Sequence, residues 1–109
     1  MATTYKVLGQ SAPAATTLTT LYTVPASTST IVSTITVANR AASAGTYRIA
    51  VRVAAASIAN SQYLIYDASL SANSTDTMTL GITLAATDVI SVYASTTDFT
   101  FNAFGTELS

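Results

Sequence analysis

The sequence predicts a single all-β domain, a β-sandwich or jelly roll of about eight short antiparallel strands. Three observations support this fold class. The chain has 109 residues, which is enough for one hydrophobic core. Its apolar residues alternate with polar ones, the period of a strand with one buried face. Turn-forming residues separate the alternating segments, and no segment shows a long helical period.

The clearest alternation spans residues 46–53. The side chains expected to face the core are Tyr47, Ile49, Val51 and Val53. The side chains expected on the opposite, polar face are Thr46, Arg48, Ala50 and Arg52. Because β-branched and aromatic residues favour a half-buried pleated surface, this segment is predicted to be a strand of the sandwich.

Further strands are expected at residues 5–8, 18–24, 31–37, 63–66, 78–84, 89–94 and 99–103. Pro25 cannot donate to a ladder and should end the second of these strands. In the third, Ile31, Ile35 and Val37 are expected on one face. Residues 63–66 are apolar on both sides, so this strand should lie in the centre of a sheet or be covered from outside.

The chain divides into two parts. Residues 1–15 are expected to form an N-terminal arm, or a first strand with a flexible connection, because residues 9–17 show no periodicity. Residues 16–109 are expected to form the sandwich. The apolar runs are far shorter than the ~20 residues that a spanning helix needs. The first residues also lack the pattern of a signal peptide, so neither membrane attachment nor secretion is expected.

Composition excludes several chemistries. The chain contains no Cys and no His, which excludes disulfides, thiolate metal sites and the Ser-His-Asp triad. Its net charge is −1, so it lacks the positive surface that nucleic acid requires. Charged residues make up 8% of the chain, and Ala, Thr and Ser dominate the rest. We therefore expect no enzyme activity, no cofactor and no nucleic-acid partner, and a part built into an assembly is favoured.

The acidic residues are few and scattered. They are Asp67, Asp76, Asp88, Asp98 and Glu107. Each Asp lies in or beside a turn signal, where a carboxylate usually caps backbone amides. A carboxylate pair for glycoside hydrolysis is the alternative, which is disfavoured. No Asp-x-Asp cluster occurs, so no metal site is expected.

Basic and aromatic side chains are the candidates for contact with a partner. Arg40, Arg48 and Arg52 fall within a short stretch, where they could pair with carboxylates of another subunit or simply keep a strand soluble. An N-terminal arm carrying Tyr5 and Lys6 could add to a neighbouring sheet edge. Tyrosines could pack at an interface or stack on sugars. The candidate partner-interface residues are Tyr5, Lys6, Arg40, Arg48, Arg52, Tyr63 and Tyr66.

Six segments carry a family resemblance. They are residues 21–26 (LYTVPA), 31–40 (IVSTITVANR), 46–52 (TYRIAVR), 63–67 (YLIYD), 84–95 (LAATDVISVYAS) and 101–107 (FNAFGTE). Over roughly residues 20–107 this pattern resembles small structural proteins of tailed bacteriophages, including those that infect cyanobacteria. Ala86 departs from the pattern, because Gly is common at this place in such loops.

The resemblance implies a non-enzymatic virion component made in the host cytoplasm. The leading expectation is a capsid decoration (cement) protein, bound to the major capsid protein outside the head shell as a homo-oligomer such as a trimer. The alternative is a protein of the tail, neck, baseplate or fibre. A second alternative, from the residues alone, is a carbohydrate-binding module that uses Tyr63, Tyr66 or Tyr93.

Overall fold

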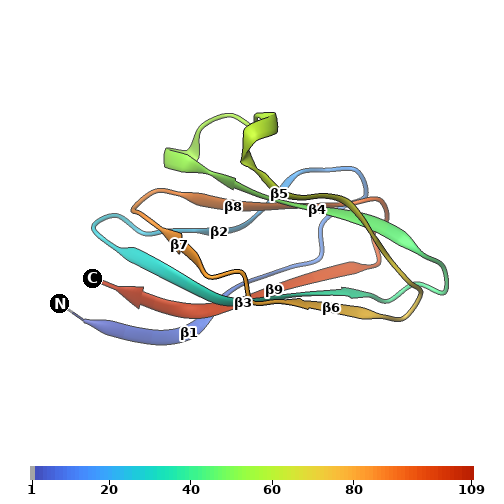
Figure 1. Ribbon diagram of the computed structural model, residues 1–109, viewed down its shortest axis with the longest axis horizontal. Helices are drawn as coiled ribbons and strands as arrows, with labels where there is room; N and C mark the ends of the chain where they lie inside the picture. The colour runs from blue at the N-terminus through green and yellow to red at the C-terminus, as the bar shows by residue number, and fades with distance from the viewer. Residues whose placement is uncertain (1) are drawn as a thin grey trace.

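The computed structural model describes residues 2–109, which form two antiparallel sheets packed face to face (Figure 1). The five-stranded sheet contains β1 (Thr3–Ser11), β9 (Phe99–Leu108), β3 (Ser29–Asn39), β6 (Thr75–Met78) and β7 (Ile82–Leu84). The four-stranded sheet contains β2 (Thr19–Thr23), β8 (Val89–Ala94), β4 (Gly45–Arg52) and β5 (Tyr63–Leu70), in that spatial order. The expected all-β sandwich is confirmed.

The strand pairing is that of a jelly roll. In the five-stranded sheet the order is β1-β9-β3-β6, with β7 also paired to β3. If β6 and β7 are counted as one interrupted strand, the first strand pairs with the last, the second with the second-last, and so on inward to the β4–β5 hairpin. The β3–β9 and β4–β8 pairings then join these strand pairs into the two sheets.

The core lies between the sheets and is built from the alternating residues of the long strands. Phe99 and Phe101 of β9 are fully buried against Tyr47 of β4, with ring centroids 6.2 Å apart in both pairs. Strand β9 points Phe99, Phe101 and Ala103 into the core, and the expected inward positions of Tyr47 and Ile49 on β4 are confirmed. Within residues 2–109, every buried side-chain nitrogen and oxygen has a hydrogen-bond partner.

The expectation that Ile31 shares a face with Ile35 and Val37 is wrong. Between Val32 and Thr34, strand β3 has one more residue than β9, which is a β-bulge at Ser33. The extra residue reverses the alternation, so Val32 and Ile35 are both buried while Ile31 is 44% exposed. The bulge faces Gly105, where a Cβ would collide with the Ile31 carbonyl.

The expectation that Val53 continues the buried face of β4 is also wrong. The strand ends at Arg52, and Val53 begins a short 3₁₀ turn, η1 (Val53–Ala55), where it is 65% exposed. Ala54 has φ 53°, a left-handed conformation that ends the strand period. The Asp88 carboxylate stabilises this turn by accepting the Ala54 N–H at 2.8 Å.

Two further segments differ from expectation. Residues 78–84 do not form one strand, because Gly81 at φ 66° separates β6 from β7 and leaves Leu80 exposed. Residues 63–66 begin β5, which is an edge strand rather than a central one. It follows a second 3₁₀ turn, η2 (Asn60–Gln62), and leaves Leu64 exposed. No described helix is long and apolar enough to cross a membrane.

The sequence left two alternatives for the N-terminal residues, an arm or a first strand. In the structure they form the edge strand β1. It runs along β9 from Thr3 to Ser11 (Figure 1). Ala2 and Ser109 extend the pairing through reciprocal backbone hydrogen bonds of 2.6 and 2.9 Å. Both ends of the described chain, Ala2 and Ser109, therefore lie at one end of the five-stranded sheet (Figure 1).

Candidate functional site

An arginine–tyrosine stack lies on the outer face of the four-stranded sheet. Arg48 on β4 is the register partner of Tyr93 on β8, and Tyr66 comes from the other neighbour, β5. The guanidinium carbon of Arg48 lies 4.1 Å from the ring centroid of each tyrosine. Arg48 is thus held between two aromatic faces, an arrangement stabilised by cation–π attraction.

A β-bulge places two partners opposite this arginine. Between the Tyr47 and Ile49 pairings, β5 has two residues, Tyr66 and Asp67, where β4 has only Arg48. Asp67 has φ 53° and accepts two bonds from Arg48, Nε to Oδ1 at 2.6 Å and Nη2 to Oδ2 at 3.2 Å. These hydrogen bonds raise the pKa of Arg48 and lower the pKa of Asp67.

Beside this stack lies a concavity of about 430 Å³ lined by Asn60, Tyr63 and Tyr66, which we call the tyrosine groove. The two rings meet edge to face, with centroids 4.9 Å apart. Tyr66 is 58% exposed even though Arg48 covers part of it. The groove combines exposed aromatic surface with one amide, which suits a ligand that has both an apolar face and hydroxyl groups.

The other two arginines have partners within the chain. Arg52 donates to Ser91 Oγ at 3.1 Å and to the Ala56 carbonyl at 3.0 Å, which ties β4 to the turn that follows it. Arg40 donates to the Thr97 carbonyl at 3.2 Å. Each of the three arginines, which were considered together because they are close in sequence, therefore has its own partners within the chain.

A second polar cluster lies between the sheets, on the inner face of β1. Glu107 accepts hydrogen bonds from the Tyr22 hydroxyl at 2.5 Å and from Lys6 at 3.3 Å. The Tyr22 hydroxyl is also 2.8 Å from Thr30 Oγ1. Burial, reinforced by Glu107, raises the pKa of Tyr22 to about 12. The Tyr22 hydrogen bond in turn lowers the pKa of Glu107.

Two other aspartates also have structural roles. Asp76 accepts a hydrogen bond of 2.7 Å from the Tyr47 hydroxyl, which links the two sheets. Burial and this hydrogen bond raise the pKa of Tyr47. Asp88 accepts backbone N–H groups from Ala54 and from Ala85, as expected of a turn carboxylate. Within residues 2–109, no three carboxylates gather as a metal site would require.

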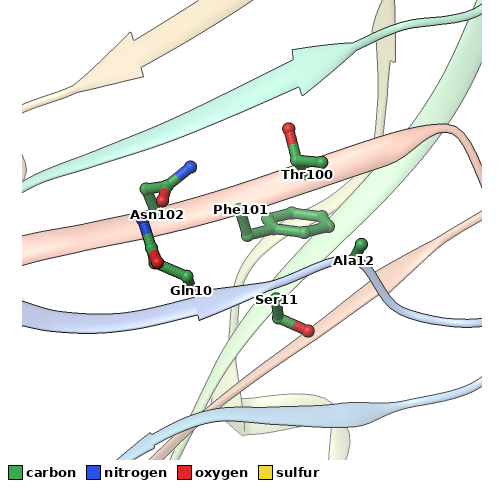
Figure 2. A pocket seen from close by; sticks show the side chains of 6 residues that line it. All are labelled: Gln10, Ser11, Ala12, Thr100, Phe101 and Asn102. Atoms are coloured by element: carbon green, nitrogen blue, oxygen red, sulfur yellow. The ribbon is translucent and has the colours of Figure 1, made fainter.

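A shallow pocket of about 260 Å³ lies where β1 ends beside β9 (Figure 2). Its lining residues are Gln10, Ser11, Ala12, Thr100, Phe101 and Asn102. Phe101 is fully buried, so this pocket presents amides and hydroxyls but no ring face. It offers fewer kinds of contact than the tyrosine groove, which we take as the candidate ligand site.

The structure does not bring all the sequence-predicted site residues together. Arg48, Tyr63 and Tyr66 come together in the four-stranded sheet, whereas Tyr5 and Lys6 lie on the edge of the other sheet. The residues added by the structure are Asn60 and Asp67. The sequence carried no signal for Asn60, and Asp67 resembled an ordinary turn carboxylate.

The fold and this site define a small jelly-roll domain with an aromatic–arginine surface. Comparisons of the chain with protein-family models, with curated proteins and with solved structures found no significant match.

Proposed function

We propose that this protein is a non-enzymatic structural component of a phage virion, a capsid decoration protein bound to the outside of the head shell. The family resemblance in the sequence supports a virion role. The jelly-roll order adds support, because this architecture recurs in viral capsid domains. Fold alone does not assign a function, so the proposal depends on the surface.

The observation that carries the proposal is a surface with few free charges and many uncovered apolar side chains. The chain has four basic and five acidic side chains. Those with a hydrogen-bond partner within the chain are Lys6, Arg40, Arg48, Arg52, Asp67, Asp76, Asp88 and Glu107. The exposed large apolar side chains are Tyr5, Val7, Ile31, Val53, Ile58, Leu64, Tyr66 and Leu80.

Such a surface suits a protein that works in an assembly. When a partner covers apolar side chains that are exposed in the isolated chain, the free energy of the system falls and the complex is stabilised. A protein that binds the assembled shell, but not loose subunits, stabilises the shell by mass action. The partner we propose is therefore the major capsid protein, with many copies of this chain bound over the shell.

Immunogold electron microscopy on intact particles of the phage that encodes this chain tests the proposal. Even labelling over the head is the expected result. Labelling confined to one end of the particle would place the chain in the tail, neck, baseplate or fibre instead. If mass spectrometry of purified particles finds no peptide of this chain, the virion role itself is wrong.

The tyrosine groove favours a second candidate function, binding of carbohydrate on a host surface. The exposed Tyr66 ring and the half-buried Tyr63 ring, beside the Asn60 amide, match the apolar face and hydroxyls of a pyranose ring. We expect Tyr66→Ala to abolish retention on immobilised polysaccharide. Tyr5→Ala, which removes an even more exposed tyrosine on the other sheet, is the control and should leave retention unchanged. Equal loss in both variants, or no retention of the unmodified protein, would contradict this function.

A further inference from the structure

One sheet edge stands out among the four in this molecule. The edges are β1 and the β6–β7 segment in the five-stranded sheet, and β2 and β5 in the other. An open edge presents a row of backbone N–H and C=O groups that are unpaired within the sheet and can pair with another strand. Folded proteins usually protect such edges with bulges, interruptions, charges or very short strands.

Three of the four edges carry such protection. The β6–β7 edge consists of strands of four and three residues, interrupted at Gly81. The β5 edge contains the bulge at Tyr66 and Asp67. Asp67 is charged, and its backbone adopts the left-handed conformation. The β2 edge has five residues and an irregularity between Thr20 and Tyr22. On each of these edges, such a feature prevents another strand from pairing continuously along it.

From Thr3 to Val7 the β1 edge has no bulge and no interruption, unlike the other three edges. Its pairing with β9 is regular over this stretch, and the first irregularity falls between Val7 and Gly9. The stretch contains no Pro. Its one charge, Lys6, is engaged by Glu107 of the same chain. Beyond the irregularity Gly9 packs closely against the Leu21 carbonyl, so the regular stretch is the accessible part of the edge.

The hydrogen-bond phase shows which groups point away from the sheet. Ala2 and Ser109 exchange both backbone hydrogen bonds, so they form a hydrogen-bonded pair. Such pairs alternate with non-hydrogen-bonded pairs along an antiparallel ladder. Thr4 and Lys6 therefore direct their backbone groups to β9. The residues that direct theirs outward are Thr3, Tyr5 and Val7.

We propose that a second copy of this chain pairs with this edge, β1 against β1, about a two-fold axis that passes through Tyr5. In this register Tyr5 forms the hydrogen-bonded pair with Tyr5 of the second copy, and Thr3 pairs with Val7 on either side. All three outward N–H groups of each chain find an acceptor. The two five-stranded sheets become one continuous sheet.

The side chains support a copy of the same chain as the occupant. Tyr5 is 82% exposed and Val7 is exposed beside it, both on the outer face with Phe104 and Ile31. A two-fold axis perpendicular to the sheet keeps the outer faces on one side, so the two apolar patches merge into one. No charge of either chain opposes a like charge in the outward positions, which makes the edge self-complementary.

Light scattering after size-exclusion chromatography tests the pairing on the full chain. The expected result is a concentration-dependent mass that approaches twice the chain mass of 11.2 kDa. Tyr5→Pro removes the outward N–H but keeps every backbone hydrogen bond to β9. Because the proposed dimer is symmetric, the substitution removes two hydrogen bonds from the contact. We expect it to raise the dissociation constant about ten- to hundredfold.

Two controls separate the backbone contact from other effects. Tyr5→Thr removes the ring but keeps the N–H, so it should weaken pairing less than Tyr5→Pro does. Leu64→Lys places a charge on the β5 edge and should leave the mass unchanged. If Tyr5→Pro fails to fold, Tyr5→Lys, which sets two like charges at the axis, should also give a monomer.

Several outcomes would overturn the proposal. They are a monomer at the highest soluble concentration, a trimer, and a dimer that resists both Tyr5→Pro and Tyr5→Lys. A dimer disrupted by Leu64→Lys would place the contact on β5 instead. None of these outcomes depends on a virion role, so this inference can fail while the proposed function stands, and the reverse also holds.

Discussion

The outer faces of the two sheets differ in how their apolar side chains are covered. On the four-stranded sheet, Arg48 lies between Tyr66 and Tyr93, and Asp67 holds it there. On the five-stranded sheet, Tyr5 and Ile31 are exposed to solvent. The same two-residue period thus produces one outer surface on which a cation stacks on tyrosine rings and one on which Tyr5 and Ile31 have no such contact.

This difference follows from where the few charges lie. Strands β4 and β5 provide a cation and a carboxylate that meet across a bulge on the outer face. In β1 the one charge, Lys6, is bound to Glu107 near the inner cluster. The outer face of β1 therefore has no charged side chain to cover Tyr5 or Val7. We expect contacts between copies on the five-stranded sheet and contacts with small ligands on the four-stranded one.

The largest expected effect comes from the core that supports both faces. Phe101→Ala should lower the free energy of unfolding by about 3–5 kcal/mol, because Phe101 is fully buried and packs on Tyr47 of the other sheet. Phe104→Ala, on the outer face of the same strand, should cost much less. Chemical denaturation of both variants measures the difference. Equal losses would mean that the two faces of β9 are not distinct.

Alkaline pH should weaken the polar cluster around Tyr22 and Glu107, which lies on the inner face of β1. The pKa of Tyr22 is about 12 in the folded chain against 10.0 for an ordinary tyrosine, so the folded state retains this proton longer. The stabilisation is complete below pH 10 and is lost as the pH rises to about 12. The expected loss is at most about 2–3 kcal/mol, because solvent screening reduces the effect of the shift. Denaturation midpoints across this window should fall less steeply in Tyr22→Phe, and equal slopes would rule out Tyr22 as the cause.

Most of the core could be predicted from the sequence because long strands with regular partners keep a strict alternation. Phe99 and Phe101 lie where the period places them, since β9 is paired on both sides. A β-bulge changes the face of every residue beyond it, and no residue type marks it. Ser33 is an ordinary strand residue in sequence, so the exposure of Ile31 could not be predicted.

The candidate site shows the same limit. Arg48, Tyr63 and Tyr66 were each named from their residue types, but their convergence depends on the bulge at Asp67. That residue adopts φ 53°, which Asp tolerates but its sequence context does not require. Which strands become neighbours in a jelly roll also depends on pairings between distant parts of the chain. Sequence periodicity does not specify those pairings.

A smaller effect is expected where one hydroxyl links the two sheets. Tyr47→Phe removes the 2.7 Å hydrogen bond to Asp76 while keeping the buried ring. The expected loss of stability is about 1–2 kcal/mol, since the acceptor is a carboxylate that water can still reach. Thermal denaturation near neutral pH measures it, and Tyr63→Phe in the tyrosine groove is the control. A loss no larger than that of the control would mean that water replaces this bond at no cost.

The smallest effect on stability should come from the arginine that covers the four-stranded face. Arg48→Gln removes an ion pair with Asp67, whose carboxylate is exposed to solvent, so the melting temperature should fall slightly, and less at high salt. The near-ultraviolet circular dichroism of the tyrosines should change clearly, because Tyr66 and Tyr93 lose the planar guanidinium between them. Arg48→Lys keeps the charge but not the planar group and should give the same spectral change. If either variant also formed larger oligomers, the covering of these rings would be what keeps this face from associating, as the contrast between the two sheets implies.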